Sequence, residues 1–145
     1  MIFDNKLWVI AGHVGGGVTL NDVWYTTDGS HWAVATNEAA FSKRRGHTSV
    51  VFDNKMWVIG GWTGSARLND VWYSSNGADW YQATANAGFA ARDLHASVVY
   101  DNKMWVINGW SGSGRYGDVW YSFNGVNWTR ATQNADFPAR SRHRA

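Results

Sequence analysis

The strongest constraint on this chain is a threefold internal repeat. The pattern Asp-Asn-Lys-x-Trp-Val-Ile begins at Asp4, Asp53 and Asp101, so the copies start 49 and 48 residues apart. A fixed period of this length is typical of stacked repeats and propeller blades. The one extra residue lies before Asn21, in the loop AGHVGGGVTLND. Four further sets keep a spacing of 48: Trp24, Trp72 and Trp120; Trp32, Trp80 and Trp128; Phe41, Phe89 and Phe137; and Arg44, Arg92 and Arg140.

Each repeat predicts four short β-strands. In the second repeat these are HTSVVFD, KMWVIGG, DVWYSS and WYQAT, separated by Asp-Asn-Lys, Gly-Gly and Asn-Gly turn signals. The composition agrees, because 145 residues include 11 Trp and 16 Gly but only one Pro, which favours strands and tight turns over helices. Four strands per unit is the strand count of a propeller blade. We therefore expect an all-β fold with three four-stranded antiparallel blades.

The motifs that recur in every repeat resemble those of kelch repeats. They are Arg-x-x-His, a glycine pair after the second strand (Gly60-Gly61, with Ala11-Gly12 and Asn108-Gly109 elsewhere), Asn-Asp-Val-Trp-Tyr or a close variant, and a Trp seven or eight residues on. The resemblance covers the whole chain. It implies a β-propeller that acts as a scaffold or binding module without catalytic activity. We expect one domain, residues 1–145, with approximate blades at 1–46, 47–94 and 95–145.

The repeated tryptophans have two interpretations. They form either an aromatic stripe that binds sugars or a core between neighbouring blades. Because they recur identically within or beside predicted strands, the core interpretation is favoured.

The two ends of the sequence complete one repeat. Six residues separate His47 from Asp53, and six also separate His143 from Asp4 if the C-terminus is joined to the N-terminus. Three blades do not close a ring, whereas propellers typically have four to eight. We therefore expect a two-fold homodimer with six blades, in which one blade of each copy is completed across the termini. The residues of this dimer junction are Met1, Ile2, Phe3, His143, Arg144 and Ala145.

Other assemblies stay open at this point. The sequence does not distinguish three origins: a natural half-propeller, an engineered repeat protein, and a fragment of a larger propeller, including a propeller enzyme. A trimer with nine blades is less favoured, because kelch-type rings usually have six or seven.

The loops between the second and third strands differ among the repeats, which marks them as a candidate ligand face. Aromatic rings beside arginine on glycine-rich loops suit a sugar ring, a peptide or an anionic group. In kelch-like domains this face commonly engages partners, so the resemblance points to the same surface. The alternative is that loops vary without a functional cause. The candidate ligand-binding residues are His13, Trp62, Arg67, Trp110, Arg115 and Tyr116.

One Arg-x-x-His motif per repeat predicts a ring of charged and titratable groups at the channel mouth. Such a ring can attract an anion or, through neutral imidazoles, a metal. The favoured alternative is that these side chains join each blade to its neighbour by hydrogen bonds, since buried polar groups need partners. The residues are Arg44, His47, Arg92, His95, Arg140 and His143.

The sequence gives little support for an enzyme or a cofactor. There is no cysteine, so the Cys–Tyr crosslink of galactose-oxidase-like propellers cannot form, and Glu38 is the only glutamate. The turns TTDGSHW, SSNGADW and SFNGVNW lack a residue of the sialidase Asp-box. A net charge of +2, spread over the repeats, is a poor footprint for nucleic acid, and no apolar run is long enough to span a membrane. We expect no cofactor and no metal site, and the compartment stays undetermined.

Overall fold

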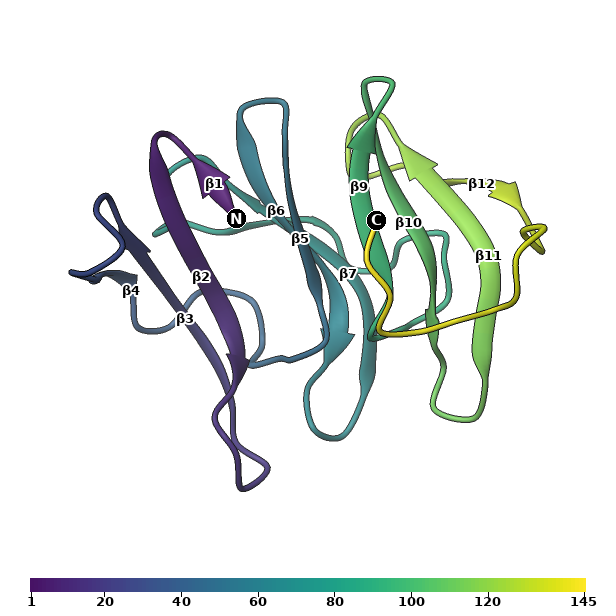
Figure 1. The fold of residues 1–145 in the computed structure, drawn as a ribbon, viewed down its shortest axis with the longest axis horizontal. Coiled ribbons are helices and arrows are strands. Elements are labelled where there is room, and N and C mark those ends of the chain that lie inside the picture. Colours follow the sequence, from purple (N-terminus) through teal and green to yellow (C-terminus); the bar gives the residue numbers. More distant parts are fainter.

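The structure is a computed structural model that describes residues 1–145. It contains twelve β-strands in three four-stranded antiparallel sheets and no helix (Figure 1). The all-β prediction with three four-stranded blades is thereby confirmed. Blade 1 contains β1 (Ile2–Phe3), β2 (Lys6–His13), β3 (Thr19–Thr26) and β4 (Ala33–Thr36). Blade 2 contains β5 (Thr48–Phe52), β6 (Lys55–Trp62), β7 (Arg67–Ser74) and β8 (Tyr81–Thr84). Blade 3 contains β9 (Ala96–Tyr100), β10 (Lys103–Trp110), β11 (Arg115–Ser122) and β12 (Thr129–Thr132).

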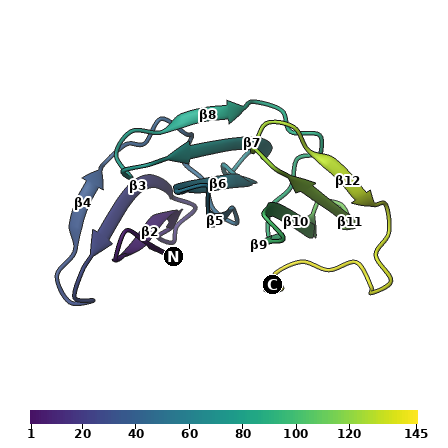
Figure 2. The same cartoon turned by 90° about the horizontal axis from the view of Figure 1, so that it is seen from above.

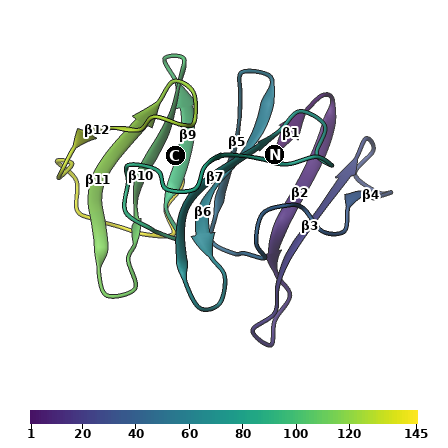
Figure 3. The same ribbon diagram turned by 180° about the vertical axis from the view of Figure 1, so that it is seen from behind.

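The three blades form an open arc. Strand order within each sheet follows the chain, so every blade is a meander of neighbouring antiparallel strands. Seen from above, β4, β8 and β12 lie on the outside of the arc and both termini lie on its inner side (Figure 2). The view from behind shows the same three separate sheets side by side (Figure 3). A single copy therefore presents two end faces, one on blade 1 and one on blade 3.

The innermost strand of blade 1 is shorter than its counterparts. β1 has two residues, whereas β5 and β9 have five each. Ile2 and Phe3 pair with Leu7 and Lys6 of β2, and the Met1 amino group donates to the Trp8 carbonyl at 3.0 Å. Residues 143–145 pair with no strand of the same copy.

A bulge near the end of the second strand positions the chain segment that enters each blade. In blade 2 the register with β7 shifts between Ile59 and Gly61, where Gly60 and Gly61 have φ of 56° and 107°. A Cβ on Gly61 would lie 2.9 Å from the Cβ of His47, closer than such atoms approach. Glycine thus lets β6 pack against the segment that carries Arg45 and His47.

The core lies between the blades rather than within one of them. One apolar cluster joins blades 1 and 2, and the second joins blades 2 and 3. In each, a phenylalanine that follows one blade contacts a tryptophan of the next, edge to face. The ring centroids of Phe41 and Trp80 are 5.1 Å apart, and those of Phe89 and Trp128 are also 5.1 Å apart. Edge-to-face pairs of this kind add to the stabilisation from buried area.

The position of the repeated tryptophans depends on whether a neighbouring blade is present. Trp80 and Trp128 are buried at the two junctions. Trp72 is half-buried, and its ring centroid lies 6.4 Å from that of Phe41. Trp32, on the end face of blade 1, is exposed. The core interpretation thus describes Trp80 and Trp128, while Trp32 occupies the same repeat position without a neighbour to cover it.

Candidate functional site

Two buried arginines join consecutive blades. The Arg44 backbone N–H donates to Leu20 of blade 1 at 3.0 Å. Its guanidinium reaches blade 2, where Nη1 and Nη2 donate to the two carboxylate oxygens of Asp70 at 2.7 and 2.8 Å. Arg92 repeats the arrangement with Asp118 of blade 3, at 2.7 and 2.9 Å. Both arginine side chains are fully buried.

The carboxylates of these pairs accept further hydrogen bonds. Each also accepts from an indole Nε1, that of Trp72 on Asp70 and that of Trp120 on Asp118, at 2.8 and 2.7 Å. Burial alone raises the pKa of Asp118, but the hydrogen bonds from Arg92 and Trp120 outweigh it and hold that pKa below its ordinary value. The pairs are therefore bidentate, charged links between blades.

The histidines of the same motif lie on the inner side of the arc and are held neutral. Burial, helped by the charge of Arg44, lowers the pKa of His47 to about 4. Burial, helped by the positive charge of Arg92, lowers the pKa of His95 to about 3. The Nε2 of His95 lies 2.8 Å from the Thr48 hydroxyl, which links β9 to β5. The Nδ1 atoms of His47, His95 and His143 have no hydrogen-bond partner.

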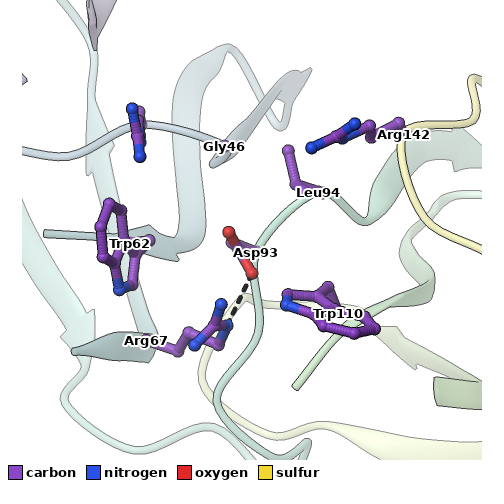
Figure 4. Close-up of a pocket in the computed structure, with 8 residues that line it drawn as sticks. Gly46, Trp62, Arg67, Asp93, Leu94, Trp110 and Arg142 are labelled. Carbon is purple, nitrogen blue, oxygen red and sulfur yellow. Dashed lines mark hydrogen bonds and ion pairs between the residues drawn. The ribbon is translucent and has the colours of Figure 1, made fainter. Parts of the chain in front are cut away.

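A cavity of about 420 Å³ opens between blades 2 and 3, a volume within the range of small-ligand sites. Figure 4 shows Trp62 and Trp110 on either side of an ion pair between Arg67 and Asp93. In that pair Nε of Arg67 donates to Asp93 at 2.8 Å. Further lining residues are Arg45, Gly46, Leu94 and Arg142.

The cavity combines flat aromatic faces with cations. The Arg45 guanidinium carbon lies 4.5 Å from the centroid of the Trp62 ring, within the range of a cation–π contact. Asp93 neutralises one of the three arginines at the wall, so Arg45 and Arg142 leave the site net positive. Such a surface suits a planar or sugar-like group that carries negative charge.

The structure brings together three of the six predicted ligand residues, namely Trp62, Arg67 and Trp110. Arg115 lies beside a neighbouring, smaller hollow with Trp110. Tyr116 lies outside both hollows, with its ring 4.2 Å from the Arg92 guanidinium carbon. His13 lies on blade 1, where Nδ1 donates to the Val18 carbonyl at 2.7 Å, and it does not line the cavity.

A comparison with protein-family models matches residues 1–145 to the KLHDC2/KLHL20/DRC7 Kelch-repeats domain. The chain belongs to this kelch-repeat family. The resemblance inferred from the repeated motifs is thereby confirmed. No curated protein matches the chain in a sequence search. Membership indicates a propeller-type binding or scaffold module, since kelch-repeat domains generally bind protein partners.

The kelch domain contains no group of three or more His, Asp or Glu side chains placed to hold a metal ion. No helix in it is long and apolar enough to cross a membrane.

Sequence reasoning missed five residues that line the cavity, Arg45, Gly46, Asp93, Leu94 and Arg142. All five occupy the two variable positions of the Arg-x-x-His motif: Arg45 and Asp93 hold the first, and Gly46, Leu94 and Arg142 hold the second. These positions depart from the repeat just as the loop residues do. Searching for departures from the repeat in the Arg-x-x-His segments, as was done for the loops, would have identified them.

Proposed function

We propose that this kelch domain is a non-catalytic binding scaffold and that two copies close into a six-bladed ring. The observation that carries the proposal is that Phe137 and Trp32, whose repeat counterparts are buried against each other at an internal junction, are exposed on the two opposite end faces. Support for a non-catalytic role comes from the family, whose members are generally interaction modules.

The aromatic side chains of the end faces support this closure. Phe41 and Phe89 are 1% exposed, but Phe137, one repeat later, is 41% exposed. On the opposite face, Trp32 is 41% exposed, whereas Trp80 and Trp128 are 5% and 9% exposed. A second copy would place Phe137 against Trp32 just as Phe89 lies against Trp128.

A second pair of positions supports the same geometry. At the two internal junctions, the Trp8 ring covers Gly77 and the Trp57 ring covers Gly125, so that no side chain would fit on either glycine. Trp105 is the third tryptophan of this set, and Gly29, the third glycine, has nothing near its Cβ position. Phe137 and Trp32 are each still 41% exposed, so covering these large rings removes apolar surface from water and gives association a hydrophobic driving force.

Sedimentation or multi-angle light scattering tests this closure. At micromolar concentration we expect a mass twice the 16.2 kDa of one chain, because a closed ring of six blades leaves neither end face exposed. Phe137→Ser should shift the protein toward the monomer. The control Phe123→Ser removes a ring that is 59% exposed and lies on the side of blade 3 that faces blade 2, and it should leave the mass unchanged. A folded wild-type monomer, or a mass of three chains, would contradict the proposal.

The cavity between blades 2 and 3 supports a second candidate function, the binding of a glycan or peptide. Its support is that Trp62, Arg67 and Trp110, which come from two different loops, line a single hollow. The two indole rings offer stacking surfaces, and the arginines offer charged donors for carboxylate or hydroxyl oxygens.

Tryptophan fluorescence during titration with acidic oligosaccharides and acidic peptides tests this candidate. We expect a saturable change that disappears in the double variant Trp62→Ala/Trp110→Ala. The variant Tyr81→Ala removes a ring that is 56% exposed on β8, away from the cavity, and should titrate like the wild type. A response that survives the double variant would place binding elsewhere.

A further inference from the structure

Each internal arginine–aspartate pair has a fixed set of partners. The Arg44 Nε donates to the Ser42 carbonyl at 3.0 Å, and its Nη1 also donates to the Gly60 carbonyl at 3.0 Å. Arg92 does the same with the carbonyls of Ala90 and Asn108, at 3.0 and 2.8 Å. The pair thus consists of an arginine oriented by its own blade and a carboxylate supplied by the next one.

The two end faces each carry half of a third pair. Arg140 is oriented like its equivalents, because its Nε donates to the Pro138 carbonyl at 3.0 Å and its guanidinium lies 5.0 Å from the Phe137 ring centroid. Its side chain is exposed, and no carboxylate contacts it. Asp22 accepts from Trp24 Nε1 at 2.8 Å, as Asp70 and Asp118 do from their tryptophans, but no arginine reaches it.

We propose that Arg140 of one copy and Asp22 of a second copy form this third pair and set the register of the ring. The inference deepens the proposed function and rests on it, because it names the charged contact that aligns the two copies. The Ala11 carbonyl of the second copy, which occupies the position of Gly60 and Asn108, accepts the remaining Nη1 hydrogen bond.

A backbone contact supports the same alignment. The Leu94 N–H donates to the Gly46 carbonyl at 2.7 Å, and the Arg142 N–H donates to the Leu94 carbonyl at 2.8 Å. This row links blades 2 and 3 at the inner side of the arc. The Gly46 N–H lies at one end of this row of hydrogen bonds, and the Arg142 carbonyl lies at the other. In the proposed ring, the Arg142 carbonyl of one copy would accept from the Gly46 N–H of the second copy and so continue the row.

A charge exchange tests the pair. We expect Arg140→Asp and Asp22→Arg each to raise the dimer dissociation constant at least 100-fold, because both junctions of each homodimer then hold two like charges. A one-to-one mixture of the two variants should form a heterodimer with a dissociation constant within tenfold of the wild-type value. One junction of this heterodimer pairs Arg140 with Asp22 as in the wild type. The other junction holds the same two charges with their positions exchanged. The double variant on one chain should also regain the homodimer.

The mixture also separates a ring of two copies from a ring of three. The two variants must alternate around a ring to avoid like charges, and alternation is impossible with three members. Native mass spectrometry reads the composition directly. The control Lys43→Asp makes the same charge change at an exposed position between blades 1 and 2, and it should dimerise as the wild type does.

Three results would overturn the inference. If either single variant dimerises as tightly as the wild type, Arg140 and Asp22 do not align the copies, although the ring itself stands. If both variants are folded by circular dichroism but the mixture stays monomeric, the two residues do not meet. If the wild type is itself a folded monomer, the proposed function fails and the pair fails with it.

Discussion

Replacing Arg92 with alanine is expected to lower the free energy of unfolding by about 3–5 kcal/mol, because it strips a buried carboxylate of its charged partner. Arg92 is fully buried and makes two bonds to Asp118 at 2.7 and 2.9 Å and a third to the Asn108 carbonyl at 2.8 Å. Its loss also removes the charge over the Phe89 and Tyr116 rings. Urea unfolding followed by far-ultraviolet circular dichroism measures the change.

Two comparisons make this result specific. Arg130→Ala removes an exposed guanidinium on β12, 5.6 Å from the Trp120 ring centroid, and should cost at most about 1 kcal/mol. The double variant Arg92→Ala/Asp118→Ala should lose less stability than the sum of the single losses, because the orphaned carboxylate is gone as well. Strict additivity would show that the two groups do not act as a pair.

Acidification is expected to destabilise the fold strongly between pH 6.5 and pH 4. In the unfolded chain a histidine has its ordinary pKa of 6.5, whereas in the fold the pKa of His47 is about 4 and that of His95 about 3. In this window the unfolded state therefore binds more protons, so stability is complete above pH 6.5 and falls as the pH drops. Each pKa unit corresponds to about 1.4 kcal/mol, which makes the total loss several kcal/mol.

Thermal melts across this pH range, compared with those of His95→Gln, test the cause. Glutamine does not titrate, so the variant should lose less stability per pH unit than the wild type. The control His31→Gln removes a histidine whose side chain is 92% exposed, and it should keep the wild-type pH profile. An unchanged profile in His95→Gln would assign the acid sensitivity to other groups.

The repeat made the blades predictable from sequence. Asp4, Asp53 and Asp101 lie in the turns of equivalent hairpins, so their spacing located every sheet. The other turn residues located the strands within each sheet. In the structure Asp53 and Asn54 have φ of 49° and 52°, as the tight turn between β5 and β6 requires. Local chemistry was therefore sufficient for the strands.

The side-chain partners were harder to predict, because they depend on how far each blade rotates against the next. Spacing alone does not show that Arg44 reaches Asp70, 26 residues later and on another sheet, so the sequence favoured an inter-blade link over a role at the channel mouth but did not identify the partner. Tyr116 was expected at the ligand face as a loop residue. It is instead the second residue of β11, opposite Gly109, and its ring packs on Arg92.

Of the two junctions within one chain, only that between blades 2 and 3 holds the cavity, and this would set the valency of the proposed ring. Between blades 1 and 2, His13 and Thr19 hold the positions that Trp62 and Arg67 hold between blades 2 and 3, so blade 1 contributes neither an indole ring nor an arginine there. A ring of two copies therefore carries two such hollows, on the same side and across the axis from each other. A surface that displays many copies of one ligand would engage both hollows at once. The apparent affinity of the ring for that surface would then exceed the affinity of a single hollow, because of avidity.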